Sequence, residues 1–144
     1  MFIKNFILGL TAAVFFAAPV LAADPPVRKF NIQSSESGAK YITGGVGDQQ
    51  QAAMERRFSD YSFKLVNVRN QGQSAYVSKV DVSIQNKAGK TVVKAVTEGP
   101  WLFADLEAGT YNLTAKFNGA TQERKISIRD DGHERQVLKW DTSG

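Results

Sequence analysis

From residue 60 onward, apolar and polar residues alternate along several short stretches of the chain. The clearest case holds Val80, Val82 and Ile84 between polar neighbours. Because successive side chains of a strand point to opposite faces, such alternation predicts strands with one buried face. Turn-forming residues separate these stretches. The pattern therefore predicts an all-β fold. We expect a seven-stranded antiparallel β-sandwich over residues 60–141.

The most regular stretch lies between residues 99 and 115 and predicts a strand, a tight turn and a second strand. Gly99-Pro100 should end the preceding element, and the apolar run Trp101–Leu106 predicts the first of the two strands. Gly109 can adopt the positive φ that a sharp reversal requires. Beyond it, apolar residues at every second position predict the second strand.

Apolar positions of the predicted strands should form the core between two sheets. They include Val80, Val82, Ile84, Leu106, Tyr111, Leu113 and Ile126. Lys64 has the opposite parity to Phe63 and Leu65, so its side chain should point to water. Val66 and Val68 continue the apolar series in the other phase, which predicts a bulge.

One short helix is predicted within residues 41–59, a segment that should pack on the sandwich. Asp48 is a good N-cap residue, and Gln51 three residues later completes a capping-box pattern. Residues 49–58 contain neither Gly nor Pro. Three apolar residues of this stretch share one side at helical spacing, which predicts the packing face: Ala53, Met54 and Phe58.

Residues 1–22 have the features of a secretory signal peptide. Lys4 gives the start a positive charge, and Phe6–Ala18 is an apolar run of thirteen residues. Small or aliphatic residues at 20–22 predict cleavage after Ala22. Because a bilayer span needs roughly 20 residues, we expect no membrane span once the signal peptide is removed.

The segment 23–40 should be extended or flexible. Prolines near its start fix φ and disfavour helix in the preceding residue. Phe30–Gln33 alternates like a short edge strand, and Lys40–Thr43 predicts a second short strand.

Cysteine and charge content narrow the class of protein. The sequence has no cysteine, so the chain forms no disulfide and no thiolate metal site. Together with a signal peptide, this predicts a periplasmic protein of a bacterium. Loss of residues 1–22 removes only Lys4 from the charged set, leaving 17 Lys and Arg against 14 acidic residues. These basic residues are scattered, which argues against nucleic acid as a partner.

Two motifs of the chain resemble carboxypeptidase regulatory-like domains. Leu106–Ala115 follows the pattern L-x-x-G-x-Y-x-L/V-x-A, and Val80–Ile84 with the turn at Gly89 follows V-x-V-x-I, then D/N-x-x-G. The similarity covers roughly residues 60–140, and residues 41–48 look like small bacterial periplasmic members whose function is generally uncharacterised. The resemblance implies a transthyretin-like (prealbumin-like) sandwich, close to the immunoglobulin type, and an exported protein. It implies no activity.

The sequence offers no constellation of catalytic or metal-binding residues. The transthyretin-related hydroxyisourate hydrolases use several histidines and an arginine, whereas this chain has a single histidine, His133. A turn histidine needs a nucleophile or carboxylate held beside it to act as a base. Asp130-Asp131-Gly132 lacks the alternating oxygen ligands of a calcium loop. We therefore expect no enzyme, no bound metal and no cofactor.

The loop before the helix is the one candidate ligand site. Gly44, Gly45 and Gly47 precede the helix start, where backbone N–H groups can bind an anion. Asp48 would place a carboxylate on the same donors, which favours a structural cap. Trp101 joins the candidate set as an aromatic residue suited to a glycan or a protein partner. Four aromatic residues could form such a platform, although strand aromatics usually fill cores: Tyr76, Trp101, Phe103 and Trp140.

These observations favour a non-enzymatic exported binding or accessory module whose partner is another envelope protein or a component of the cell envelope. One alternative is a small ligand-binding or hydrolytic protein with its site at the Gly44–Asp48 loop. Another is a structural subunit that adds a strand to a neighbour's open edge. The ligand and the oligomeric state stay open at this point.

Overall fold

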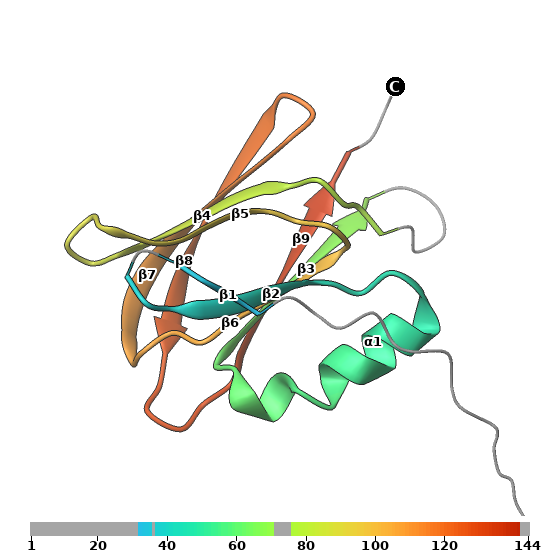
Figure 1. The fold of residues 1–144 in the computed structure, drawn as a ribbon. Coiled ribbons are helices and arrows are strands. Elements are labelled where there is room, and N and C mark those ends of the chain that lie inside the picture. Colours follow the sequence, from blue (N-terminus) through green and yellow to red (C-terminus); the bar gives the residue numbers. More distant parts are fainter. Residues whose placement is uncertain (1–31, 36, 71–75, 142–144) are drawn as a thin grey trace, which may run out of the picture.

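The structure, a computed structural model, describes residues 32–35, 37–70 and 76–141. Within them nine strands form two stacked sheets, and a helix covers the outer face of one sheet (Figure 1). The predicted two-sheet β fold is confirmed, but the two sheets contain nine strands and not seven. Seven strands lie within residues 60–141, and two earlier strands extend one sheet by pairing with it. The predicted signal peptide and most of the extended segment lie outside the described residues.

Sheet A contains five strands in the order β1-β2-β6-β3-β9. In chain order they are β1 (Gln33–Ser34), β2 (Lys40–Gly44), β3 (Phe63–Arg69), β6 (Trp101–Ala104) and β9 (Glu134–Trp140). The predicted strand at residues 40–43 is confirmed as β2. Of the strand predicted at residues 30–33, only Gln33 belongs to β1, and residues 30 and 31 are not described.

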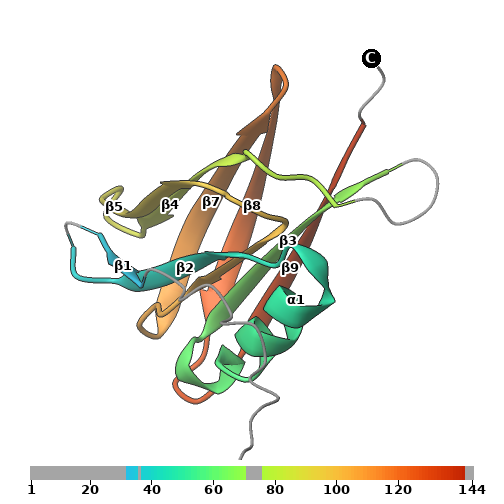
Figure 2. The same ribbon diagram turned by 45° about the vertical axis from the view of Figure 1, so that its right-hand side comes forward.

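Sheet B contains four strands in the order β5-β4-β7-β8, all antiparallel. They are β4 (Asp81–Asn86), β5 (Thr91–Val96), β7 (Gly109–Phe117) and β8 (Ala120–Ile128). The β7–β8 turn is the dipeptide Asn118-Gly119, and both residues have the positive φ that a two-residue hairpin turn requires, 51° and 82°. Figure 2 shows the four strands of sheet B side by side behind sheet A.

The first and last strands of residues 60–141 pair in parallel, which corrects the expectation of a wholly antiparallel fold. Phe63 lies opposite Glu134, and Arg69 lies opposite Trp140. Both strands start at the same end of the molecule, where the backbone N–H of Glu134 donates to the carbonyl oxygen of Ser62 at 2.8 Å. β8 also ends at that end of the molecule, and a short connection leads from it to the start of β9. β9 therefore runs in the same direction as β3.

The predicted tight turn at Gly109 is a crossing between the two sheets and not a hairpin. β6 belongs to sheet A and β7 to sheet B, so the two strands do not pair. The hydroxyl of Ser62 donates to the carbonyl oxygen of Leu106 at 2.7 Å and accepts the Leu106 N–H at 2.8 Å. These two bonds fix the crossing to the start of β3.

The main core lies between the sheets, as predicted. All seven predicted core residues are buried, and six more large side chains share the cluster with them: Tyr41, Phe63, Leu65, Leu102, Leu138 and Trp140. Trp140 also satisfies its indole N–H, which donates to the Oδ1 of buried Asn67 at 3.0 Å. The alternation along β4 and β7 therefore assigned the inward faces correctly.

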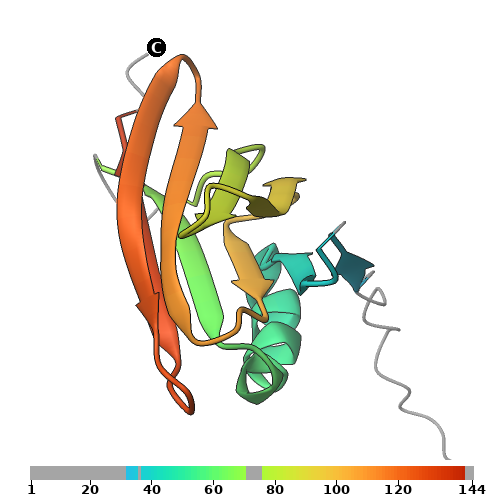
Figure 3. The ribbon, with the colours of Figure 1, turned by 90° about the vertical axis from the view of Figure 1, so that its left-hand side faces the viewer.

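A second apolar cluster lies on the other face of sheet A, beneath the helix α1 (Gly47–Glu55) and the short 3-10 helix η1 (Phe58–Asp60). Figure 3 shows α1 on the side of sheet A that faces away from β7 and β8. The cluster consists of Ile42, Met54, Tyr61, Val66, Trp101 and Phe103. Sheet A is thus covered on both faces.

Double coverage explains two wrong predictions about β3. Residues 63–67 are all buried, and Lys64 is only 3% exposed although it was expected to point to water. Val66 belongs to the cluster beneath α1, on the same side as Lys64. The apolar residues therefore change phase because β3 is buried on both faces. β3 pairs in continuous register with β6 and β9, so the expected bulge is absent from it.

The helix is confirmed, but it starts earlier and is capped differently. Its N-cap is Val46, and Asp48 lies in the first turn without capping any N–H group. The Oε1 atom of Gln50 accepts the Val46 N–H at 2.7 Å, and the Gln51 side chain donates to the carbonyl oxygen of Gly45 at 2.9 Å. Two glutamines therefore hold the helix start in place of the predicted capping box.

Leu113 tests the assignment of the inner face of sheet B. Its side chain is 1% exposed in the main core, so Leu113→Ala should lower the free energy of unfolding by about 2–5 kcal/mol in urea denaturation. Asn112→Ala, at an exposed position on the other face of β7, is the control and should change it by less than about 0.5 kcal/mol. Equal effects of the two substitutions would contradict the assignment.

Candidate functional site

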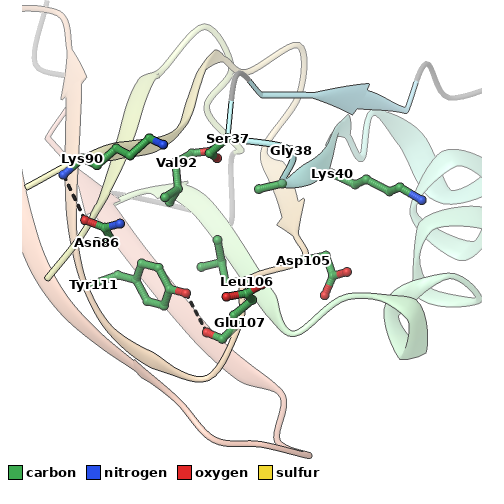
Figure 4. Close-up of a pocket in the computed structure, with 11 residues that line it drawn as sticks. Ser37, Gly38, Lys40, Asn86, Lys90, Val92, Asp105, Leu106, Glu107 and Tyr111 are labelled. Carbon is green, nitrogen blue, oxygen red and sulfur yellow. Dashed lines mark hydrogen bonds between the residues drawn. The ribbon is translucent and has the colours of Figure 1, made fainter. Parts of the chain in front are cut away.

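A groove opens where three connections meet beside the main core. They are the β1–β2 turn, the β4–β5 hairpin and the β6–β7 crossing (Figure 4). Its volume is about 410 Å³, and eleven residues line it: Ser37, Gly38, Ala39, Lys40, Asn86, Lys90, Val92, Asp105, Leu106, Glu107 and Tyr111. Connections held by a rigid scaffold commonly carry binding residues. This groove is therefore the leading candidate site of the described residues.

The β4–β5 hairpin places Asn86 and Lys90 on one wall of the groove. The Asn86 N–H donates to the Lys90 carbonyl oxygen at 2.8 Å. The Oδ1 atom of Asn86 accepts the N–H groups of Ala88 and Lys90, each at 3.0 Å. Both backbone and side chain of Asn86 thus stiffen the turn, which fixes the position of Lys90.

The β1–β2 turn closes the groove from the side of sheet A. The Oγ atom of Ser37 donates to the carbonyl oxygen of Val92 in β5 at 3.0 Å. This bond joins the edges of the two sheets directly. The turn is itself held by Ser35, whose Oγ accepts the Ala39 N–H at 3.1 Å.

The floor of the groove is apolar except for one hydroxyl. Val92, Leu106 and the ring of Tyr111 form it, and Leu106 and Tyr111 are buried. The Tyr111 hydroxyl donates to the carbonyl oxygen of Glu107 at 2.6 Å. Burial first, and then the Glu107 carboxylate, raise the pKa of Tyr111 above its ordinary value of 10.0, so the hydroxyl stays protonated at neutral pH.

Opposite charges face each other across the groove. Figure 4 shows the carboxylates of Asp105 and Glu107 on one side and the Lys90 side chain on the other, running toward Ser37. The Lys40 side chain points away from the groove toward α1. The groove therefore presents one ammonium group and two carboxylates around an apolar floor.

The residues of the predicted glycine loop come together, but as packing partners. Gly44 is the register partner of Trp101 across β2 and β6. A Cβ atom on Gly45 would lie 2.9 Å from the Trp101 ring, and one on Gly99 would lie 2.3 Å from the Gly44 oxygen. Only glycine permits these approaches. Gly45 thus makes room for Trp101, which is 7% exposed, whereas a Cβ atom on Gly44 would meet the side chains of Gln50 and Met54.

The other two loop residues lie at the start of α1. Gly47 has a φ of +80° at the first helical position, and Asp48 is exposed beside it. The Val46 N–H bonds to Gln50. The binding role predicted for this loop and Trp101 stays a prediction, and the groove is a second candidate site.

Lys64 lies in a box of aromatic rings beneath α1. Its Nζ atom is 3.9 Å from the ring centroid of Trp101, 5.4 Å from that of Phe103 and 5.7 Å from that of Phe58. The same atom forms an ion pair with Glu55, whose side chain is 49% exposed. Ring faces attract a cation, and a carboxylate neutralises it, so the buried charge is compensated. The lysine thus occupies the position between these rings.

The aromatic platform considered from the sequence does not form. Trp101, Phe103 and Trp140 are buried in the two clusters, and Tyr76 alone of the four is substantially exposed, at 47%. The expectation that strand aromatics fill cores is confirmed for three of them.

His133 is held structurally at the start of β9. Its Nδ1 atom lies 2.8 Å from the carbonyl oxygen of Tyr61, and its ring packs against Phe58 in a tilted arrangement, with 5.1 Å between the ring centroids. No three His, Cys, Asp or Glu side chains of the described residues come together as metal ligands. In the same residues, no helix is long and apolar enough to cross a membrane.

Sequence reasoning missed the groove because its lining residues come from three separate connections. Lys90, Asp105 and Glu107 are ordinary surface residues in the sequence, and Leu106 and Tyr111 were assigned to the core. Repeated turn signals at residues 34–38 and 86–90 marked the connections, but nothing local shows that they meet. No family model, curated protein or solved structure matches the chain.

Lys64 offers a test of the aromatic box. Lys64→Ala should lower the free energy of unfolding by about 2–4 kcal/mol because it empties a packed space, whereas Lys64→Met should cost less than about 1.5 kcal/mol. Urea denaturation measures both. Lys125→Ala, at an exposed position of β8, is the control with little expected effect. A Met variant as unstable as the Ala variant would show that the ammonium group and not the packing holds the helix.

Tyr111 should make the protein sensitive to alkali. Because the pKa of Tyr111 is raised in the fold, the unfolded chain ionises first, and stability is complete below pH of about 10 and lost as pH rises further. Burial raises the pKa of Tyr61 as well. Tyr111→Phe should reduce the fall in Tm between about pH 9 and pH 11, and Tyr76→Phe should not. Identical pH profiles for Tyr111→Phe and the parent would refute this.

Proposed function

We propose that this protein is an exported, non-enzymatic binding module of the bacterial periplasm that holds a small ligand in the groove between its two sheets. The observation that carries the proposal is the groove itself, with charged walls over a floor of Val92, Leu106 and Tyr111. Its volume of about 410 Å³ falls within the roughly 300–1,000 Å³ of small-molecule sites.

Binding is better supported than hydrolysis by the chemistry of the lining. The residues that line the groove include no histidine or cysteine. Ser37 is the one serine there, and its hydroxyl donates to the Val92 carbonyl oxygen and not to a base. An activated nucleophile needs a base within hydrogen-bond reach, so the arrangement favours binding over catalysis.

Export and family remain part of the proposal on sequence grounds. The apolar run at residues 6–18 and the absence of cysteine support a periplasmic location. The motif at residues 106–115 supports a carboxypeptidase regulatory-like domain of transthyretin type. An envelope protein or another component of the cell envelope would supply the ligand.

At the β5 edge, the strand-adding alternative has weaker support. β5 is an edge of sheet B, but its carbonyl oxygens at Val92 and Lys94 accept the hydroxyls of Ser37 and Tyr41, at 3.0 and 3.5 Å. The register of β5 also shifts opposite Ile84, and such bulges protect edges from pairing. An incoming strand would have to displace these contacts.

Nuclear magnetic resonance of the purified protein with a panel of small compounds tests the proposal. The panel contains amino acids, dipeptides, monosaccharides and simple carboxylates. Shift changes should gather at Val92, Leu106 and Tyr111. The matched control is the shallow hollow on the outer face of sheet B, around Asp81 and Lys116, which should not respond. Changes confined to that hollow, or none at all, would overturn the proposal.

A further inference from the structure

We infer that the ligand of the groove is a zwitterion of about dipeptide size, with a free ammonium group, a free carboxylate and an aliphatic body. This inference rests on the proposed function and adds the chemical class of the ligand. It follows from three features of the groove: unpaired charges of both signs, hydrogen-bonding groups beside each charge, and the apolar floor.

The three charges at the rim are not satisfied by one another. Lys90, Asp105 and Glu107 form no ion pair within the described residues, although ammonium and carboxylates face each other across the groove (Figure 4). The walls therefore hold opposite charges farther apart than the 4.0 Å of an ion pair. A molecule with a charge at each end can bridge that gap and satisfy both walls.

The wall of Lys90 suits a carboxylate. Because Asn86 uses its Oδ1 atom to accept two backbone N–H groups, its Nδ2 donors are left over, and Figure 4 shows this nitrogen on the side of the groove. The Lys90 ammonium group and the Asn86 amide donors lie on the same wall, and each can donate to a carboxylate; the ammonium group does so by a charge-assisted hydrogen bond.

The opposite wall suits an ammonium group. The carboxylates of Asp105 and Glu107 are acceptors, and the Tyr111 hydroxyl, which donates to the Glu107 carbonyl oxygen, keeps a free lone pair. A primary ammonium group has three N–H donors, and either carboxylate on this wall can accept from it. Between the two walls, Val92 and Leu106 would contact the aliphatic part of the ligand.

Ligands of other classes fit this arrangement less well. A simple anion would meet two carboxylates, and a simple cation would leave Lys90 without a partner. A neutral sugar would use neither charged wall and would cover an apolar floor with hydroxyl groups. These classes are the alternative outcomes of the experiment below.

The probe is the dipeptide L-alanyl-L-leucine, compared with its N-acetylated and C-amidated forms in titrations followed by nuclear magnetic resonance of the whole protein. The free dipeptide should shift Val92, Leu106 and Glu107, and blocking either end should weaken binding at least about tenfold. Lys90→Gln should weaken the free dipeptide but not the C-amidated form. Glu107→Gln should weaken the free dipeptide but not the N-acetylated form. Lys116→Gln, on the outer face of sheet B, is the matched control.

The outcomes separate this inference from the proposed function. Equal affinity for the free and blocked dipeptides would overturn the zwitterion. Groove shifts caused only by a monosaccharide or a simple carboxylate would overturn it too, and would leave the groove as a binding site. Failure of every compound to shift the groove residues would overturn both. Thermal unfolding of each variant within about 2 °C of the parent confirms that the fold is intact.

Discussion

Strand β3 is buried on both faces, and this double burial organises the rest of the molecule. Its one face contributes Phe63 and Leu65 to the core between the sheets, and its other face places Lys64 and Val66 beneath α1. A lysine can occupy that layer only where its charge is compensated, and the ring of Trp101 and the Glu55 carboxylate provide the compensation. The helix, the glycine that admits Trp101 (Gly45) and the register of β6 all contribute to this layer.

The same feature sets the limit of what the sequence could predict. Alternation assigned the inward faces of β4 and β7 correctly because those strands have one face toward water. In β3, both parities carry buried residues, so the pattern resembled a slip of phase and gave Lys64 the wrong environment. The period of apolar residues in a strand does not show whether its sheet is covered on one face or on both. The helix that covers the second face is encoded in another part of the chain.

The groove could not be predicted from the sequence for a different reason. A glycine-rich loop before a helix is a local signal, and it drew attention to Gly44 and Gly45, which pack closely against α1 side chains and the Trp101 ring, respectively. The groove has no local signal, because Asn86 and Lys90, Asp105 and Glu107, and Ser37 come together only through the pairing of strands. The turn chemistry that holds Lys90 was visible in the sequence, whereas the wall opposite it was not.

The parallel pairing of β3 with β9 has a consequence for how the chain reaches its folded state. Phe63 pairs with Glu134, which lies near the end of the chain. On that side, β3 therefore has no neighbouring strand until nearly the whole polypeptide has been made. Contacts between such distant segments slow folding, because a long loop must close before they form. β3 can pair with β6 earlier, so the β3–β9 pairing should be the step of folding that depends on the last strand of the chain.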